Sequence, residues 1–196
     1  MRQPMPLVLE GRHVRLEPLD EGHRADLEAA VAEDPDALRL GVLLFVLEGW
    51  DTWYAEARAG AAAGRYVAWA TIEKASGRAV GSTRFGSIDV DAEALEIGWT
   101  WLAPSRWRTV INTEAKLLQL RHAFEDLGAG RVGLKTDARN ERSQAAIARL
   151  GAVREGTLRR HLRMPDGYIR DSVMFSILRD EWPAVRARLE ERLARR

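Results

Sequence analysis

The chain contains no cysteine, and its positive and negative charges almost cancel. The absence of cysteine excludes disulfides, thiolate metal sites and a cysteine nucleophile. A net charge of +1 at pH 7 gives no electrostatic reason to expect nucleic acid or an acidic membrane as a partner. The most apolar run, residues 40–47, is far shorter than the roughly 20 residues that a membrane span needs. No apolar segment of signal-peptide length precedes Glu10, so we expect a cytoplasmic protein.

The composition is that of a folded protein with one hydrophobic core. Hydrophobic residues make up 46% of the chain and charged residues 30%, which is typical of globular domains. A length of 196 residues is enough for one sizeable core and short for two. We therefore expect residues 1–196 to form a single domain.

The periodicity of apolar residues predicts a mixed α/β sheet. The expected strands are residues 11–18, 66–73, 79–88, 95–102, 131–136, 153–164 and 168–178. The expected helices run from a cap at Asp20 to about residue 33, over residues 51–63, from Asn112 to residue 127, from Asn140 to residue 150, and onward from a cap at Asp180. Residues 34–36 are expected to break the first helix, and residues 38–47 fit neither period.

Residues 95–128 join a strand to a helix through a short polar loop. Strict alternation places two sets of side chains on opposite faces of the strand: Leu95, Ile97, Trp99 and Trp101 on one, and Glu96, Gly98 and Thr100 on the other. Backbone N–H groups at the start of the helix have no partner within it and attract anions, so the junction suits a phosphate. The alternative is that it only packs the core of an α/β unit.

Four segments carry a resemblance to a known family. They are EIGWTWLAP, NTEAKLLQLRHAFEDLG, DARNERSQAAIARLGA and EGTLRRHLRMPDG. With the element order, they resemble the GNAT superfamily of acyl-CoA-dependent N-acetyltransferases, in the branch of the RimJ/RimL-type ribosomal-protein N-terminal acetyltransferases. The resemblance implies a mixed, mostly antiparallel central sheet with a splayed parallel strand pair and flanking helices.

The resemblance also implies where acetyl-CoA would bind as the acyl donor. The gap between residues 95–102 and residues 131–136 would hold it, with the pantetheine along the first strand and the pyrophosphate on the loop before the helix. The cofactor-binding residues expected on this basis are Trp99, Thr100, Trp101, Leu102, Arg106, Arg108, Thr109, Val110, Ile111, Asn112, Thr113 and Asn140.

The phosphate loop departs from the family pattern. Trp107, Val110 and Asn112 stand where the family usually has Gln or Arg, Gly, and Gly or Ala. Valine suits this place only if the loop is already helical there, because a left-handed backbone favours glycine. Arg106, Arg108 and Thr109 are expected to compensate with charge and hydrogen bonds, and Asn112 to cap the helix. The alternative is a GNAT-shaped protein whose cofactor site is lost or changed.

Two residues are candidates for the chemistry that the resemblance implies. Ser143, three residues after Asn140, matches the family's NxxS pattern and would give a proton to the leaving thiolate, while Asn140 would contact CoA. The alternative is that both are helix-start residues, since Asn and Ser are common there. Glu96 would take the proton of the amine, directly or through a water. Its alternative is a carboxylate on a half-solvated strand face.

The function expected is transfer of an acetyl group from acetyl-CoA to a primary amine, on a protein N-terminus or a small molecule. The other hypothesis is a non-catalytic binding module that keeps the fold. His161 and Tyr168 are weaker candidates for the acceptor site. The hairpin arginines are candidates for contacts with CoA phosphate, an acidic acceptor or RNA, or form a solvated ribbon: Arg159, Arg160, Arg163 and Arg170. No metal is expected, nucleic acid is not the expected partner, and a homodimer stays open.

Overall fold

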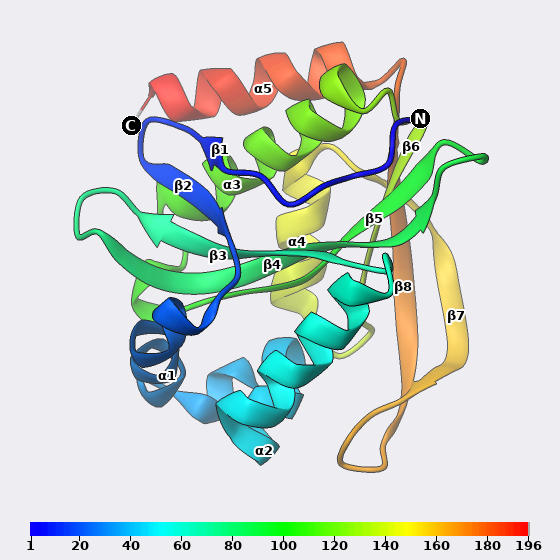
Figure 1. Cartoon of the computed structure of the whole chain (residues 1–196). Helices are drawn as coiled ribbons and strands as arrows, with labels where there is room; N and C mark the ends of the chain where they lie inside the picture. The colour runs from blue at the N-terminus through cyan, green and yellow to red at the C-terminus, as the bar shows by residue number, and fades with distance from the viewer. Residues whose placement is uncertain (196) are drawn as a thin grey trace.

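A computed structural model of the chain describes residues 1–195 and contains one eight-stranded sheet with the order β1-β2-β3-β4-β5-β6-β8-β7. Figure 1 shows this sheet with helices on both sides. The strands are β1 (Leu9–Glu10), β2 (Val14–Pro18), β3 (Val67–Glu73), β4 (Arg78–Asp89), β5 (Ala94–Leu102), β6 (Arg131–Asp137), β7 (Val153–Arg163) and β8 (Ile169–Leu178). The α-helices are α1 (Arg24–Ala32), α2 (Pro35–Ala62), α3 (Val110–Arg121), α4 (Glu141–Leu150) and α5 (Trp182–Ala194).

The pair β5 and β6 is the one parallel pair of the described sheet, and it is short. It covers the three residue pairs from Ala94–Arg131 to Glu96–Gly133. Beyond these, β5 stays with β4 as far as Leu102, and β6 stays with β8 as far as Asp137. The two strands therefore part after Glu96, and the predicted mixed sheet with a splayed parallel pair is confirmed.

The sheet separates two apolar cores. One lies on the side of α3 and α5 and includes Leu95 and Ile97 of β5. The other lies on the side of α1 and α2 and includes Phe45, Trp53 and Trp101. Figure 1 shows α3 with α5 on one side of the sheet and α1 with α2 on the other. None of the helices in residues 1–195 combines the length and apolar character that a membrane crossing requires.

Residues 34–62 fold differently from the prediction. Asp34 caps α2, its side chain accepting a hydrogen bond from the Ala37 amide at 3.0 Å, so these residues start a helix instead of merely ending one. The helix includes the unassigned residues 38–47 and runs on through Ala62, with non-helical backbone at Val42 and Gly49. These two breaks shift the apolar face along the segment, which is why its sequence shows no single helical period.

Two predicted helix caps are wrong, by three residues at α3 and by one at α5. Helix α3 begins at Val110 and is capped by Thr109, so Asn112 is not its cap. Helix α5 has Glu181 at the cap position without a side-chain hydrogen bond, so Asp180 does not cap it. At Asp20 the predicted cap is confirmed, with a short 3₁₀ turn, Glu21–His23, preceding α1. In each wrong case a second residue with a suitable side chain or position lies nearby, so capping chemistry alone does not choose between them.

Candidate active site

A β-bulge interrupts β5 where the splay opens. Trp99 and Thr100 together lie opposite the single β4 residue Thr83, at a shift in the strand register. Trp99 has a φ of 50°, a left-handed conformation that is uncommon for a bulky residue. Bulges of this kind turn side chains away from the direction that simple alternation gives them.

The bulge overturns the predicted assignment of faces after Ile97. Trp101 packs in the α2-side core, where its ring centre is 5.9 Å from that of Phe45. Leu95 and Ile97 lie in the opposite core, so the four apolar residues do not share a face. Thr100 instead faces α3. Alternation fails because the bulge adds one residue to β5 that β4 does not match.

Glu96 lies at the point where β5 and β6 part. Its side chain is buried, and its Oε2 accepts a hydrogen bond from Lys135 Nζ of β6 at 2.6 Å. Lys135 Nζ is also 5.7 Å from the centre of the Trp99 ring. A Cβ at Gly98 would come within 2.8 Å of Glu96 Oε1, so glycine leaves room for the carboxylate. Glu96 is therefore a buried, ion-paired carboxylate and not a half-solvated one.

Next to this pair, Arg84 of β4 is fully buried under α2. Its Nη1 donates to Glu56 Oε2 of α2 at 2.5 Å, and Glu56 is partly exposed. The guanidinium carbon lies 5.3 Å from the ring centres of Trp53 and Tyr66 and 5.7 Å from that of Trp99. The pair thus links α2 to the sheet and fixes the ring of Trp99 beside the splay.

On the α3 side, the bulge meets a buried lysine. Lys116 Nζ donates to the hydroxyl of Thr100 at 2.7 Å, the hydroxyl of Thr83 at 3.0 Å and the side-chain oxygen of Gln119 at 2.8 Å. All three partners are uncharged. Burial lowers the pKa of Lys116 from 10.5 to about 7, because the charged ammonium loses its hydration without gaining an anion.

The loop before α3 shows how Val110 can stand where the family usually has a glycine. Val110 is the first helical residue, and the left-handed position is Arg108, with a φ of 62°. Thr109 accepts a hydrogen bond from the Ile111 amide at 3.3 Å and donates one to the carbonyl of Arg106 at 2.8 Å. Valine is therefore compatible with this loop. Asn112 is the third residue of the helix, within its first turn, and is half-buried.

Arg106 does not lie free at the helix start. Its Nε is 2.8 Å from Glu73 Oε1, and its Nη2 donates to Glu73 Oε2 at 3.0 Å, at the end of β3. Sequence reasoning missed Arg142, whose guanidinium carbon is 3.3 Å from the centre of the Trp107 ring. The Trp107 indole donates to the Leu102 carbonyl at 2.9 Å, so this stack joins α4 to the end of β5. The position of Arg142 between Asn140 and Ser143 was the feature of the sequence that could have identified it.

The start of α4 separates the two roles considered for Asn140 and Ser143. Asn140 is buried, and its Oδ1 accepts a hydrogen bond from the Ser143 amide at 3.0 Å, so Asn140 is the cap. Ser143 is half-buried, and its hydroxyl has no hydrogen-bond partner among residues 1–195. The capping alternative therefore applies to Asn140 and not to the Ser143 side chain.

Comparison with known proteins identifies the family. Residues 13–153 match the family described as Acetyltransferase (GNAT) domain. The chain belongs to the GNAT acetyltransferase family. This GNAT protein is 32% identical over 106 residues to YdaF of Bacillus subtilis (strain 168), assigned by name as a ribosomal N-acetyltransferase. That match covers 54% of this chain and 57% of YdaF, little more than half of its length.

Solved GNAT structures cover nearly the whole chain. A protein from T. thermophilus, assigned as an acetyltransferase, is 41% identical with a TM-score of 0.82, and the match covers 97% of this chain and 98% of that one. Mycobacterium smegmatis RimJ in complex with CoA-disulfide has the same fold, with a TM-score of 0.81, 24% identity and 97% of each chain covered. The family expected from the four sequence segments is confirmed.

Within residues 1–195, this GNAT chain has no group of three or more His, Cys, Asp or Glu side chains that could hold a metal ion. The polar groups that the fold does gather lie around the splay: the Glu96–Lys135 pair, the bulge at Trp99, and the starts of α3 and α4. A site of this kind offers backbone hydrogen bonds, helix N-termini and one buried carboxylate. Groups of these kinds suit acyl transfer.

Proposed function

We propose that this GNAT protein transfers the acetyl group of acetyl-CoA to a primary amine, and that residues 1–196 form one acetyltransferase domain. The amine is that of a protein N-terminus or of a small molecule. The observation that carries the proposal is the parting of β5 and β6 after Glu96, next to the starts of α3 and α4. It leaves a strand edge, two helix N-termini and a buried carboxylate around one opening.

The donor is proposed to bind along β5 and at the start of α3. The β5 backbone from Trp99 to Leu102 has no β6 partner and offers hydrogen bonds to the amides of pantetheine. The amides of residues 109–113 suit the pyrophosphate, because N–H groups in the first turn of a helix have no partner within it. Arg108 and Arg142 are the arginines proposed here because they stand in the loop before α3 and in the first turn of α4. Asn140 is proposed to contact CoA from the start of α4.

The chemistry joins the amine nitrogen to the thioester carbonyl carbon and breaks the carbon–sulfur bond. The amine must lose a proton, and the departing CoA thiolate must gain one. We assign the first transfer to Glu96 and the second to Ser143, whose hydroxyl is not committed to another described residue. Lys135 holds the Glu96 carboxylate at the edge of the opening.

The test is an acetyl-transfer assay with a panel of peptides and small amines, with thiol release as the readout. Wild type and Glu96→Gln are compared with Lys135→Met, which removes the other half of the same ion pair. If Glu96 accepts the proton, kcat/KM of Glu96→Gln falls about 100-fold, and Lys135→Met keeps more activity. Acetyl-CoA should raise the melting temperature of all three proteins, because a ligand of the native state stabilises it.

The outcomes separate the parts of the proposal. Equal losses in the two variants would mean that the ion pair is structural and that Glu96 is not the base. A thermal shift without acetyl transfer to any amine would favour a binding module. No thermal shift at saturating acetyl-CoA would contradict the donor itself.

A further inference from the structure

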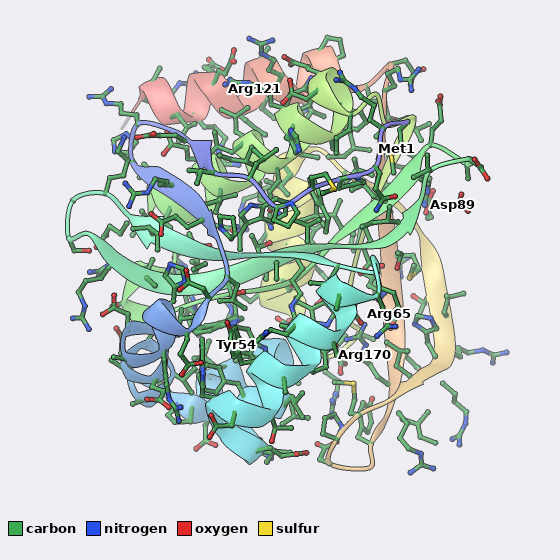
Figure 2. The ribbon with its side chains drawn as sticks, viewed as in Figure 1. Met1, Tyr54, Arg65, Asp89, Arg121 and Arg170 are labelled. Atoms are coloured by element: carbon green, nitrogen blue, oxygen red, sulfur yellow. The ribbon has the colours of Figure 1, made fainter. Side chains whose placement is uncertain are left out.

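Arg170 of β8 differs from the other cations on the α2 side of the sheet. It is half-buried, and its Nε donates to the hydroxyl of Ser172 at 2.9 Å. No carboxylate among residues 1–195 lies within ion-pair distance of it. Burial lowers its pKa, which is the sign of a cation that has lost water without gaining an anion. Figure 2 shows Arg170 on the same side of the sheet as α2.

The neighbouring cations already have anionic partners. Lys135 is paired with Glu96 at 2.6 Å, and Arg139 with Asp137 at 2.8 Å. The carboxylates of Asp137 and Glu96 act on Arg170 only from a greater distance, and the Arg139 charge opposes them. The carboxylates of Glu96 and Asp137 therefore form ion pairs with other cations and not with Arg170.

A second polar group in this place also has no partner. His161 Nδ1 is buried and makes no hydrogen bond to any described residue. The His161 ring interacts electrostatically with Lys135, Arg170 and Glu96. It therefore lies near the point where β5 and β6 part at Glu96. The β7 backbone bulges here: Arg160 has a φ of 51°, and its amide donates to Asp171 Oδ1 at 2.6 Å. A bulge of this kind sets the direction of the next side chain.

A half-buried guanidinium with a single neutral partner is costly for the fold unless something else supplies an anion. A carboxylate fits it well, because the two oxygens match the parallel N–H groups of the guanidinium fork. An imidazole nitrogen beside it adds a hydrogen-bonding group for the same molecule. Arg170 and His161 together therefore provide the polar contacts that an anionic acceptor would use.

We propose that the acceptor carries a carboxylate, which binds Arg170 while the amine of the same molecule lies at Glu96. This inference rests on the proposed acetyl transfer and adds the chemical class of the acceptor. The carboxylate has two sources, the α-carboxylate of an amino acid or the acidic side chain of a peptide. Both present the same group to Arg170.

Two matched acceptor pairs distinguish the sources. The first is alanine against alaninamide, and the second is the peptide Ala-Glu-Ala-amide against Ala-Gln-Ala-amide. Wild type should show kcat/KM about tenfold or more higher for the carboxylate member of one pair, and that pair identifies the source. Arg170→Gln should remove the preference and leave KM for acetyl-CoA unchanged. Arg170→Lys, which keeps the charge without the fork, should retain part of it.

Arg163→Gln is the control, because Arg163 is an exposed arginine of the same hairpin. It should keep the full preference. The inference is overturned if wild type treats both members of each pair alike, or if Arg170→Gln raises KM for acetyl-CoA and leaves the acceptor preference intact. A wild-type protein that acetylates none of the four but acetylates other amines of the panel overturns this inference alone. A protein that acetylates no amine of the panel overturns the proposed function, and with it this inference. Equal acetylation of all four overturns the inference alone.

Discussion

Buried charged side chains on the two sides of β5 have different partners. On the α2 side, Glu96 and Arg84 are buried, and each lies within 2.6 Å of a side chain of opposite charge. On the α3 side, Lys116 is buried among three uncharged oxygens and its pKa falls to about 7. Burial alone therefore does not decide the charge of a group. The partner matters as well: Glu96 and Arg84 each meet a side chain of opposite charge, and Lys116 does not.

The bulge at Trp99 connects these two environments. It directs Trp99 towards Arg84 and Lys135 on one side and Thr100 towards Lys116 on the other. A substitution on either side can therefore alter the conformation of the stretch of β5 that we propose as the donor site. The predictions that follow remove one element of the comparison at a time, beginning with the largest expected effect.

Removing the counterion of Arg84 should lower the free energy of unfolding more than the other substitutions at a single pH. Glu56→Gln leaves a fully buried guanidinium with a neutral amide in place of its carboxylate. Loss of one member of a buried pair is strongly destabilising, and because Glu56 is partly exposed we expect about 3 kcal/mol off the free energy of unfolding. Urea unfolding measures this. Glu48→Gln, an exposed position of the same helix, is the control and should change little.

A loss below about 1 kcal/mol in Glu56→Gln would break the comparison, since a buried cation on the α2 side would then need no anionic partner. It would also weaken the argument from Arg170. In that case an uncompensated guanidinium would no longer point to a missing anion.

Ser143 tests whether the opening itself belongs to the chemistry. Since Asn140 is the cap of α4, Ser143→Ala removes no capping hydrogen bond and should leave the melting temperature nearly unchanged. If its hydroxyl protonates the CoA thiolate, kcat should fall about 100-fold, at the lower end of the range for general acid catalysis. Turnover and thermal melting are measured on the same sample. Asn140→Ala is the contrasting variant, with an expected loss of about 1 kcal/mol in stability.

An unchanged rate in Ser143→Ala would exclude it as the proton donor. A lowered melting temperature together with an unchanged rate would show instead that its side chain supports the helix. These two results cannot be confused, because the structure gives the capping bond to Asn140.

The periodicity of the sequence predicted most of the strands and helices in their order, since long stretches have a clear period of two or of 3.6 residues. The splayed parallel pair was predicted from the resemblance to the GNAT superfamily and not from the period. The periodicity failed at Trp99, because the alternation of residues 95–101 is regular and a positive φ leaves no trace in it. The ion-pair partners of Glu96 and Arg84 could not be predicted from the sequence either. Lys135 and Glu56 lie far from them in the chain, and only the pairing of β5 with β6 and the packing of α2 bring them close. Arg106 was misplaced for the same reason, since its partner Glu73 comes from β3.

The last expected effect concerns Lys116; it depends on pH and is small for any single step of one pH unit. With a pKa of about 7 in the folded protein and 10.5 as its ordinary value, the unfolded chain holds a proton between these pH values that the folded protein has released. Folding is therefore opposed by this group below pH 7, and the penalty fades as the pH rises towards 10.5. Lys116→Met, which cannot titrate, should lack this dependence. The free energy of unfolding of wild type minus that of Lys116→Met should rise by about 1 kcal/mol per pH unit in urea titrations above neutrality.

Ser143→Ala has no altered titratable group, so its difference from wild type should stay flat over the same titrations. A flat difference for Lys116→Met as well would mean that the ammonium stays charged at alkaline pH and that the three oxygens replace its hydration fully. The α3 side would then hold a full charge with neutral partners alone, and the contrast between the two sides of β5 would disappear. A rising difference would instead show that the buried Lys116 loses its charge where it has only neutral partners.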